Sequence, residues 1–259
     1  MPYIEREAGV RIYYEERGRG PAVLLTHGYG ASARMWDGQM NALSDRYRII
    51  AWDMRGHDRS DSPESSTLYT HEASVGDMVA ILDACNVRRA VIGGLSLGGF
   101  MSLAFNLAHP ERVIALMLFD TGPGYKKDGP RAGWNRMAES IAQSFESKGL
   151  AAASRSAEAA AAHHRSAAGL AHAARGMLAQ HDGRVIESLP GIKVPTLVLA
   201  GANDAQFIPP TDYMAAKISE AEKVILANAG HAANIDQPEA FNQAVGSFLD
   251  RVTAREERM

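Results

Sequence analysis

The segment Arg89-Ala-Val-Ile-Gly-Gly-Leu-Ser-Leu-Gly-Gly-Phe100 runs from a short apolar stretch into a glycine-flanked turn that carries one serine. Residues 90–92 have the continuous apolar character of a buried strand, and the apolar residues after the turn recur at helical spacing. Gly94-Leu-Ser-Leu-Gly98 fits the G-x-S-x-G nucleophile elbow, in which a strained turn exposes the serine oxygen between two glycines. Ser96 is therefore the candidate nucleophile, although the pentapeptide alone fits a buried cap serine equally well.

Two backbone N–H groups are candidate donors to a developing oxyanion. The N–H of Leu97 follows the serine, where the start of the next helix adds partial positive charge. His27-Gly-Tyr-Gly30 follows the apolar run 22–26, and ligands bind at the carboxyl ends of strands in open α/β sheets. We predict the N–H of Tyr29 as the second donor and a structural role for His27, whose ring is expected to hydrogen-bond the loop.

Apolar segments that end in polar loops recur along the chain, with amphipathic helical segments between them. This alternation predicts an α/β fold with a doubly wound, mostly parallel sheet, preceded by an antiparallel hairpin over residues 3–16. The predicted strands of that sheet are 22–26, 48–52, 90–92, 113–119, 194–200 and 223–227.

The periodicity changes at Gly122-Pro-Gly124. An amphipathic helix is predicted over 131–145, and the alanine-rich stretch from Leu150 to Leu178 predicts further, loosely held helix. Because this insertion lies between two predicted strands, we expect it to cover their carboxyl ends as a cap. The predicted organisation is a core over 1–121, a helical cap over 122–190 and the second part of the core over 191–259.

The composition excludes several classes of partner. The 259 residues carry a net charge of −3 with both signs interspersed, so there is no basic stripe for nucleic acid and no polybasic anchor for a membrane. The polar start and the lack of a long apolar run predict a cytoplasmic protein. The charge balance instead favours a small neutral molecule as partner. His163, His164 and His172 lack the spacing of a metal site, so we predict that no metal is bound.

Two further polar residues follow predicted strands at the same edge of the sheet. Asp204 lies just past 194–200, and His231 lies in the loop after 223–227. Together with Ser96 they give the chain order Ser, Asp, His. Asp120 is the rival acid at the end of 113–119, but Thr-Gly-Pro follows it at the start of the cap, so Asp204 is favoured.

Across almost its whole length the chain resembles the α/β-hydrolase fold enzymes. Within that family it is most similar to the small-cap esterases and the 3-oxoadipate enol-lactonase group, through Arg55-Gly-His-Asp-Arg-Ser-Asp61 and His231-Ala-Ala-Asn-Ile-Asp-Gln-Pro-Glu239. One departure is Asp58, where relatives often have glycine. The motifs that carry the resemblance to the fold are His27-Gly-Tyr-Gly30, Asp53-Met-Arg-Gly56, Gly94-Leu-Ser-Leu-Gly98, Gly201-Ala-Asn-Asp204 and Gly230-His231.

The resemblance implies a serine hydrolase that needs no cofactor and acts through an acyl-enzyme on Ser96. His231 would be the general base and later the acid, and Asp204 would orient it and stabilise its imidazolium. The N–H groups of Tyr29 and Leu97 would form the oxyanion hole.

The expected substrate is a carboxylic ester or lactone with a small, largely apolar acyl group. This expectation rests on the apolar character of the residues predicted to bind it, Trp36, Trp134 and Met137, together with Tyr29 and Leu97. Dehalogenases and epoxide hydrolases of the family need an aspartate where this chain has Ser96. Perhydrolases, carbon–carbon bond hydrolases and acyl-homoserine lactone hydrolases keep the serine and stay open, as does a non-catalytic small-molecule receptor.

Overall fold

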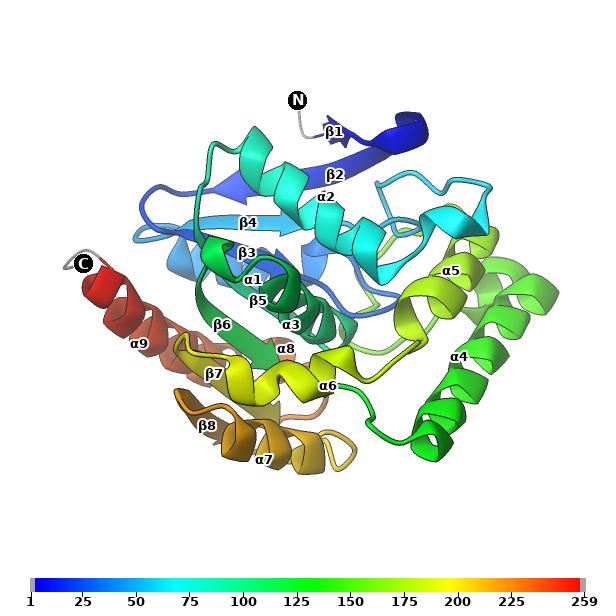
Figure 1. Ribbon diagram of the computed structural model, residues 1–259. Helices are drawn as coiled ribbons and strands as arrows, with labels where there is room; N and C mark the ends of the chain where they lie inside the picture. Colours follow the sequence, from blue (N-terminus) through cyan, green and yellow to red (C-terminus); the bar gives the residue numbers. More distant parts are fainter. Residues whose placement is uncertain (1–2, 257–259) are drawn as a thin grey trace.

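The residues described by the computed structural model, 3–256, form an eight-stranded sheet through the middle of the molecule (Figure 1). The strand order is β1-β2-β4-β3-β5-β6-β7-β8. β2 pairs antiparallel with β1 and β4, whereas the remaining neighbours are parallel, so the predicted hairpin and mostly parallel sheet are confirmed. The strands are Tyr3–Glu5 (β1), Arg11–Arg17 (β2), Ala22–Thr26 (β3), Arg48–Trp52 (β4), Ala90–Leu95 (β5), Val113–Phe119 (β6), Thr196–Gly201 (β7) and Ala221–Leu226 (β8).

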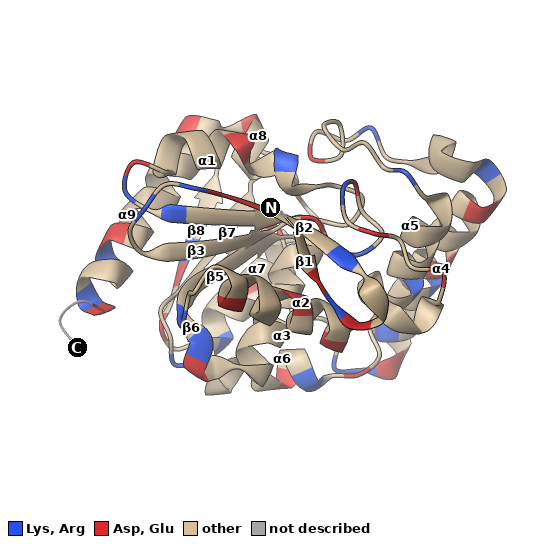
Figure 2. Cartoon of the chain, turned by 90° about the horizontal axis from the view of Figure 1, so that it is seen from above, with Lys and Arg blue, Asp and Glu red and all other residues tan. Residues whose placement is uncertain are grey.

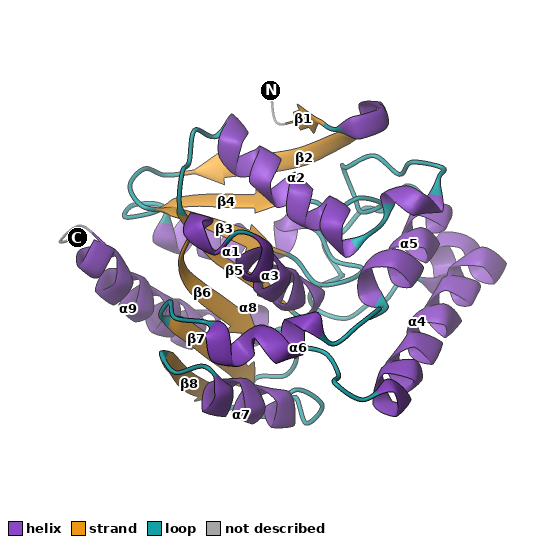
Figure 3. Cartoon of the chain, viewed as in Figure 1, coloured by secondary structure: helices purple, strands orange, loops and turns teal. Residues whose placement is uncertain are grey.

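Helices cover both faces of the sheet, as Figure 3 shows with helices in purple and strands in orange. Helices α2, α3, α6 and α7 pack on one face, and α1 and α9 pack on the other. The helices are Asp37–Leu43 (α1), His71–Ala84 (α2), Leu97–Ala108 (α3), Asp128–Lys148 (α4), Ala167–Ala173 (α5), Arg184–Ser188 (α6), Ile208–Lys217 (α7), Ala233–Asp236 (α8) and Pro238–Glu256 (α9).

The two helical layers explain why the central strands are continuous apolar runs. Side chains of a strand alternate between its faces, so Leu116 and Leu118 of β6 join the core on one face while Ala115 and Met117 join the core on the other. Every residue of β3, β5 and β7 is buried. Strands covered on both faces are the usual pattern of parallel sheets, and their carboxyl ends present the site.

The segment between β6 and β7 extends beyond the sheet. Helices α4 and α5 lie at the side where the parallel strands end, to the right in Figure 1, whereas α6 packs against α3. The helix expected over 131–145 is confirmed as α4. The helix expected from Leu150 to Leu178 is only partly correct, because residues 153–166 run as turns and irregular loop between a 3₁₀ turn and α5. The core and cap boundaries stay a prediction.

Charged residues of both signs are interspersed over the molecule, as Figure 2 shows in blue and red. No helix within residues 3–256 is both long enough and apolar enough to cross a bilayer.

Candidate active site

Ser96 lies at the junction of β5 and α3 in a strained backbone conformation, with φ of 55° and ψ of −116°. A non-glycine residue in such a region costs free energy, and such residues cluster at functional sites. The flanking glycines permit a very close approach to the end of β3. A Cβ on Gly94 would lie 2.6 Å from the Thr26 carbonyl oxygen, and one on Gly98 would lie 2.1 Å from it. The glycine-flanked turn is therefore required by packing as well as by its own backbone.

Hydrogen bonds from the neighbouring strand hold this elbow in place. The N–H of Ser96 donates to the Phe119 carbonyl at 2.9 Å, and the Thr121 hydroxyl donates to the Ser96 carbonyl. Leu97 is the first residue of α3, so its N–H has no acceptor within the helix. That N–H donates to no other residue in the described part of the chain. It is free for a negatively charged oxygen at the helix start, where the helix dipole favours one.

His231 and Asp204 meet at the carboxyl edge of the sheet. Asp204 follows β7 and His231 follows β8, and His231 Nδ1 lies 2.6 Å from Asp204 Oδ2. The Phe207 ring stacks on the imidazole at 4.9 Å between centroids, which fixes the ring plane. Among residues 3–256, His231 Nε2 makes no hydrogen bond, and none joins Ser96 Oγ to His231. Such bonds are commonly long in the absence of substrate and tighten in the complex.

The surroundings of His231 favour its protonated form. Burial alone lowers the pKa of this imidazole, but the hydrogen bond to Asp204 and the charge of Asp204 are the main opposing effects, and the pKa is raised above 6.5. A base with a raised pKa accepts a proton more readily, and its imidazolium is stabilised once formed. This is the electrostatic role expected of a carboxylate behind a catalytic histidine.

Asp120, the rival acid, lies beside this pair but is engaged differently. Its Oδ1 accepts from the Gly201 N–H at 2.8 Å, while its Oδ2 has no partner among the described residues. Burial raises the pKa of Asp120 to about 8, although the Gly201 N–H and the His231 charge act in the opposite direction. Asp120 is therefore mainly neutral near pH 7, and Asp204 is the acid in direct contact with His231.

These three side chains also bring possible metal-ligand atoms within 4.8 Å of one another. Two ligands of a tetrahedral zinc ion, each about 2.0–2.1 Å from the metal, lie about 3.3 Å apart. His231 Nδ1 and Asp204 Oδ2 are 2.6 Å apart, which is the spacing of a shared proton.

The loop that carries Tyr29 packs directly on the elbow, because a Cβ on Gly28 would lie 3.5 Å from Ser96 Cβ. His27 Nε2 accepts from the Met54 N–H at 2.9 Å, so its Nδ1 carries the proton and donates to the Gly28 carbonyl at 2.6 Å. The N–H and C=O of a trans peptide point in opposite directions. His27 therefore turns the Tyr29 N–H away from itself, and this N–H donates to no described residue.

Two histidines that sequence reasoning did not assign to the site hold the next residue of this loop. His57 Nε2 accepts from the Gly30 N–H at 3.1 Å. His164 Nε2 lies 2.8 Å from the Gly30 carbonyl, and its Nδ1 accepts from the Asp58 N–H. Burial holds the pKa of His57 well below 6.5, so its ring remains a neutral acceptor. His164 belongs to the inserted segment and thereby ties that segment to the loop.

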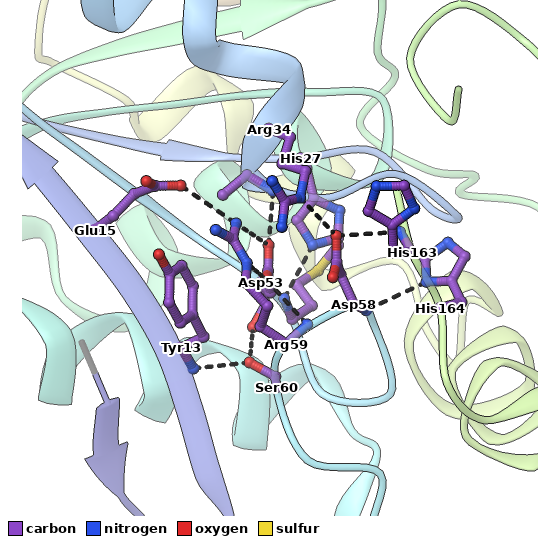
Figure 4. A network of polar contacts seen from close by, with 12 residues as sticks. Tyr13, Glu15, His27, Arg34, Asp53, Asp58, Arg59, Ser60, His163 and His164 are labelled. Atoms are coloured by element: carbon purple, nitrogen blue, oxygen red, sulfur yellow. Dashed lines mark hydrogen bonds and ion pairs between the residues drawn. The ribbon is translucent and has the colours of Figure 1, made fainter. Parts of the chain in front are cut away.

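Figure 4 shows the polar network that surrounds Asp58. Asp58 adopts a φ of +36°, in the left-handed region where glycine is most common and aspartate is tolerated. Its carboxylate accepts from Arg34 Nε at 3.3 Å and from the His163 N–H at 3.2 Å. The departure from glycine thus gives the loop two contacts that glycine would lack. Asp53 belongs to the same network and is paired with Arg59 at 2.7 Å.

A cavity of about 260 Å³ opens beside Ser96. Of the residues predicted to bind substrate, Leu97 and Trp134 line it, whereas Tyr29, Trp36 and Met137 do not. Trp36 is fully buried in the core on the other side of the sheet, 6.0 Å from the Phe119 ring. Met137 is 37% exposed on α4. The remaining lining residues are Ser96, Phe100, Thr121, Gly122, Pro123, Gly124, Tyr125, Leu178, Gln180, Gln206, Phe207 and Pro210.

Comparison with known proteins gives matches over most of the chain. A family model described as "Alpha/beta hydrolase family" matches residues 23–244. The 3-oxoadipate enol-lactonase 1 of Acinetobacter baylyi is 30% identical over 251 residues, which cover 90% of each chain.

Solved structures extend the similarity to three dimensions. A thermophilic esterase from Thermogutta terrifontis has a TM-score of 0.81 at 27% identity, with 98% of this chain and 100% of that chain covered. The enol-lactonase from Burkholderia xenovorans has a TM-score of 0.76 at 28% identity, with 96% and 100% covered. Both matches therefore include the segment between β6 and β7.

Proposed function

The chain belongs to the alpha/beta hydrolase family, and we propose that it is a serine hydrolase that cleaves a carboxylic ester or lactone through an acyl-enzyme on Ser96. The observation that carries the proposal is the contact of 2.6 Å between His231 Nδ1 and Asp204 Oδ2, at the edge of the sheet that also presents Ser96. The similarity to esterases and enol-lactonases supports the choice of ester or lactone.

In the proposed acylation, Ser96 Oγ attacks the carbonyl carbon while His231 Nε2 takes the serine proton. Asp204 holds Nδ1–H and thus leaves Nε2 as the basic nitrogen. The tetrahedral intermediate then collapses, the bond to the leaving oxygen breaks, and His231 returns its proton to that oxygen. An ester releases an alcohol, whereas a lactone keeps the new hydroxyl on the acyl group.

Deacylation repeats the sequence with water in place of the serine. His231 removes a proton from water, the hydroxide attacks the acyl carbonyl, and Ser96 Oγ leaves with the proton from His231. In both halves the negative oxygen faces the N–H groups of Leu97 and Tyr29. Removing one such donor typically costs about 10²–10³ in rate.

The cavity supports an uncharged acyl group. Its described lining residues carry no Lys, Arg, Asp or Glu, and most are apolar. A buried charge without a partner is strongly disfavoured, so an anionic acyl group is expected to react slowly. A preference for an anionic substrate by orders of magnitude would contradict this part of the proposal.

The proposal is tested by hydrolysis of p-nitrophenyl esters of increasing acyl length and of a panel of lactones. Ser96→Ala is expected to abolish turnover. Ser102→Ala is the matched control, because that hydroxyl in α3 donates only to the Gly98 carbonyl, and it should retain most of the activity. Turnover that persists in Ser96→Ala, or a parent inactive on every ester and lactone, would overturn the proposal.

A further inference from the structure

Gln180 carries a buried amide oxygen that has no hydrogen-bond partner among residues 3–256. It lines the cavity beside Ser96 and is 8% exposed. Its Oε1 accepts no hydrogen bond from any residue in the described part of the chain. Leaving a buried acceptor unpaired costs free energy, and each such group in a native protein calls for an explanation.

The backbone around Gln180 is held firmly. The Asn135 side chain on α4 forms a pair of hydrogen bonds with it, donating Nδ2–H to the Gln180 carbonyl and accepting the Gln180 N–H, each at 2.8 Å. Trp134 Nε1 donates to the nearby Leu178 carbonyl, also at 2.8 Å. The backbone from which the Gln180 side chain projects is therefore held in place. A residue that discriminates between ligands needs such support.

Gly124 makes room for this side chain. Gly124 lines the same cavity with a φ of +89°, and a Cβ at that position would lie 2.7 Å from Gln180 Oε1. Any larger residue would clash with the amide where it now lies. Glycine is thus required here both by its backbone conformation and by the position of the amide.

Thr121 and Gln206, two other polar residues of the cavity, do not combine burial with a missing hydrogen bond. The Thr121 hydroxyl is already used on the Ser96 carbonyl, and Gln206 is exposed to solvent. Within the described lining, Gln180 is the buried amide in mainly apolar surroundings. Such isolated polar groups give specificity to apolar ligand sites.

We propose that Gln180 is a specificity-determining residue, which selects substrates whose acyl group carries a neutral hydrogen-bond donor such as the N–H of a secondary amide or a hydroxyl. This rests on the proposed ester or lactone hydrolysis at Ser96. Oε1 is buried against Gly124, so the amide turns about its last side-chain bond, which has a broad torsional preference, to present Oε1 to the donor. The alkyl part of the acyl group then contacts the apolar walls. An alkyl substrate of the same shape leaves Oε1 unpaired in a drier cavity and is disfavoured.

The kinetic test compares matched acyl groups. The p-nitrophenyl ester of 3-acetamidopropanoic acid has the shape of the 5-methylhexanoate ester but carries an amide, and homologues with one to three methylenes scan its position. The 6-hydroxyhexanoate and heptanoate esters form the hydroxyl pair. We expect the parent to favour the donor-bearing ester in kcat/KM by about tenfold for at least one pair, as for one buried hydrogen bond.

Gln180→Met keeps the length of the side chain and removes its hydrogen bonding. It is expected to abolish this preference while the alkyl esters react as fast or faster. Gln206→Met is the matched control at an exposed position of the same cavity and should leave the preference unchanged. A parent without preference for any pair, or a preference that survives Gln180→Met, overturns the proposal. If Gln180→Met does not fold, the test is repeated with Gln180→Leu, and a melting curve checks that this variant is folded.

A binding measurement separates this proposal from the proposed reaction. Ser96→Ala is titrated by calorimetry with ethyl 3-acetamidopropanoate and with ethyl 5-methylhexanoate, alone and combined with Gln180→Met. Tighter binding of the amide that is lost in the double variant supports the role of Gln180 even if the parent hydrolyses no ester. Equal binding of both ligands refutes that role even if Ser96 proves to be the nucleophile.

Discussion

His231 Nδ1 lies 2.6 Å from Asp204 Oδ2, whereas the neighbouring carboxyl of Asp120 points Oδ1 at the Gly201 N–H. Two acids thus lie beside one histidine, but only one of them contacts its ring nitrogen. The structure assigns them different tasks, because a charged carboxylate stabilises imidazolium directly and a neutral buried acid does not.

Substitution of each acid by asparagine should separate these tasks. Asp204→Asn removes the charge that orients His231 and is expected to lower kcat by about 10⁴. Asp120→Asn resembles the neutral acid already present near pH 7 and should change kcat by less than about tenfold. Ester hydrolysis by the two purified variants measures both effects. A larger loss in Asp120→Asn than in Asp204→Asn would reverse the assignment.

The acid side of the pH profile reports the raised pKa of His231. This histidine must be neutral to act as a base, so activity appears only as the pH rises through its pKa. Because that pKa lies above 6.5, kcat/KM for an uncharged ester is expected to reach half its plateau above pH 6.5. Enzyme returned to pH 8 after each assay controls for inactivation. A midpoint at or below pH 6.5 would contradict the described electrostatics.

Asp120 should make stability depend on pH. Its pKa is about 8 when folded and near 3.8 otherwise, so between those values the folded chain keeps a proton that the unfolded chain releases. Stability from this group is therefore lost as the pH rises. The side chain in Asp120→Asn cannot lose a proton, so the variant does not share this loss of stability. The difference between its Tm and that of the parent, measured at the same pH, should therefore increase by at least about 3 °C from pH 5 to pH 8. A constant difference would show that Asp120 ionises normally.

His164 should support the loop of the proposed oxyanion hole from the inserted segment. His164→Ala removes the contact with the Gly30 carbonyl and is expected to lower kcat by roughly tenfold with little change in KM. Affinity for a boronic acid inhibitor, which mimics the tetrahedral intermediate, should fall in parallel. His163→Ala is the matched control, because that exposed residue contacts Asp58 through its backbone N–H. Equal effects of both substitutions would indicate general loosening of the segment.

The sequence was sufficient to place the elbow and the strands because their signals are local. Gly94 and Gly98 flank Ser96 within five residues. Both positions approach the Thr26 carbonyl so closely that a residue with a Cβ would clash there. The carboxyl ends of parallel strands then bring Asp204 and His231 to one edge without further information.

The errors occur where distant contacts decide the structure. An apolar residue such as Trp36 suits a substrate cavity as well as a protein core. Trp36 is buried in the core because it packs against the rings of Phe119 and Phe241, which are remote in sequence. Residues 153–166 have helix-favouring alanines, yet His164 and Arg165 bind backbone groups of the loop at Asp58 instead. Helix propensity is a weak preference that such tertiary contacts override.

Gln180 and His164 could not be assigned from the sequence for a related reason. A glutamine or a histidine in a polar, alanine-rich segment has no pattern that marks its environment. The environment arises from the Asn135 clamp on one residue and the Gly30 carbonyl near the other.

Mass spectrometry can detect the proposed acyl-enzyme on Ser96 while it is present. The parent is mixed with a p-nitrophenyl ester and quenched in acid within milliseconds. The mass of the whole protein is measured first, and the protein is then digested so that peptide mapping locates the modified residue. We expect a mass increase of one acyl group, located on Ser96 and missing from Ser96→Ala. An ester that is hydrolysed while Ser96 stays unmodified, with the same rate in Ser96→Ala, would contradict it.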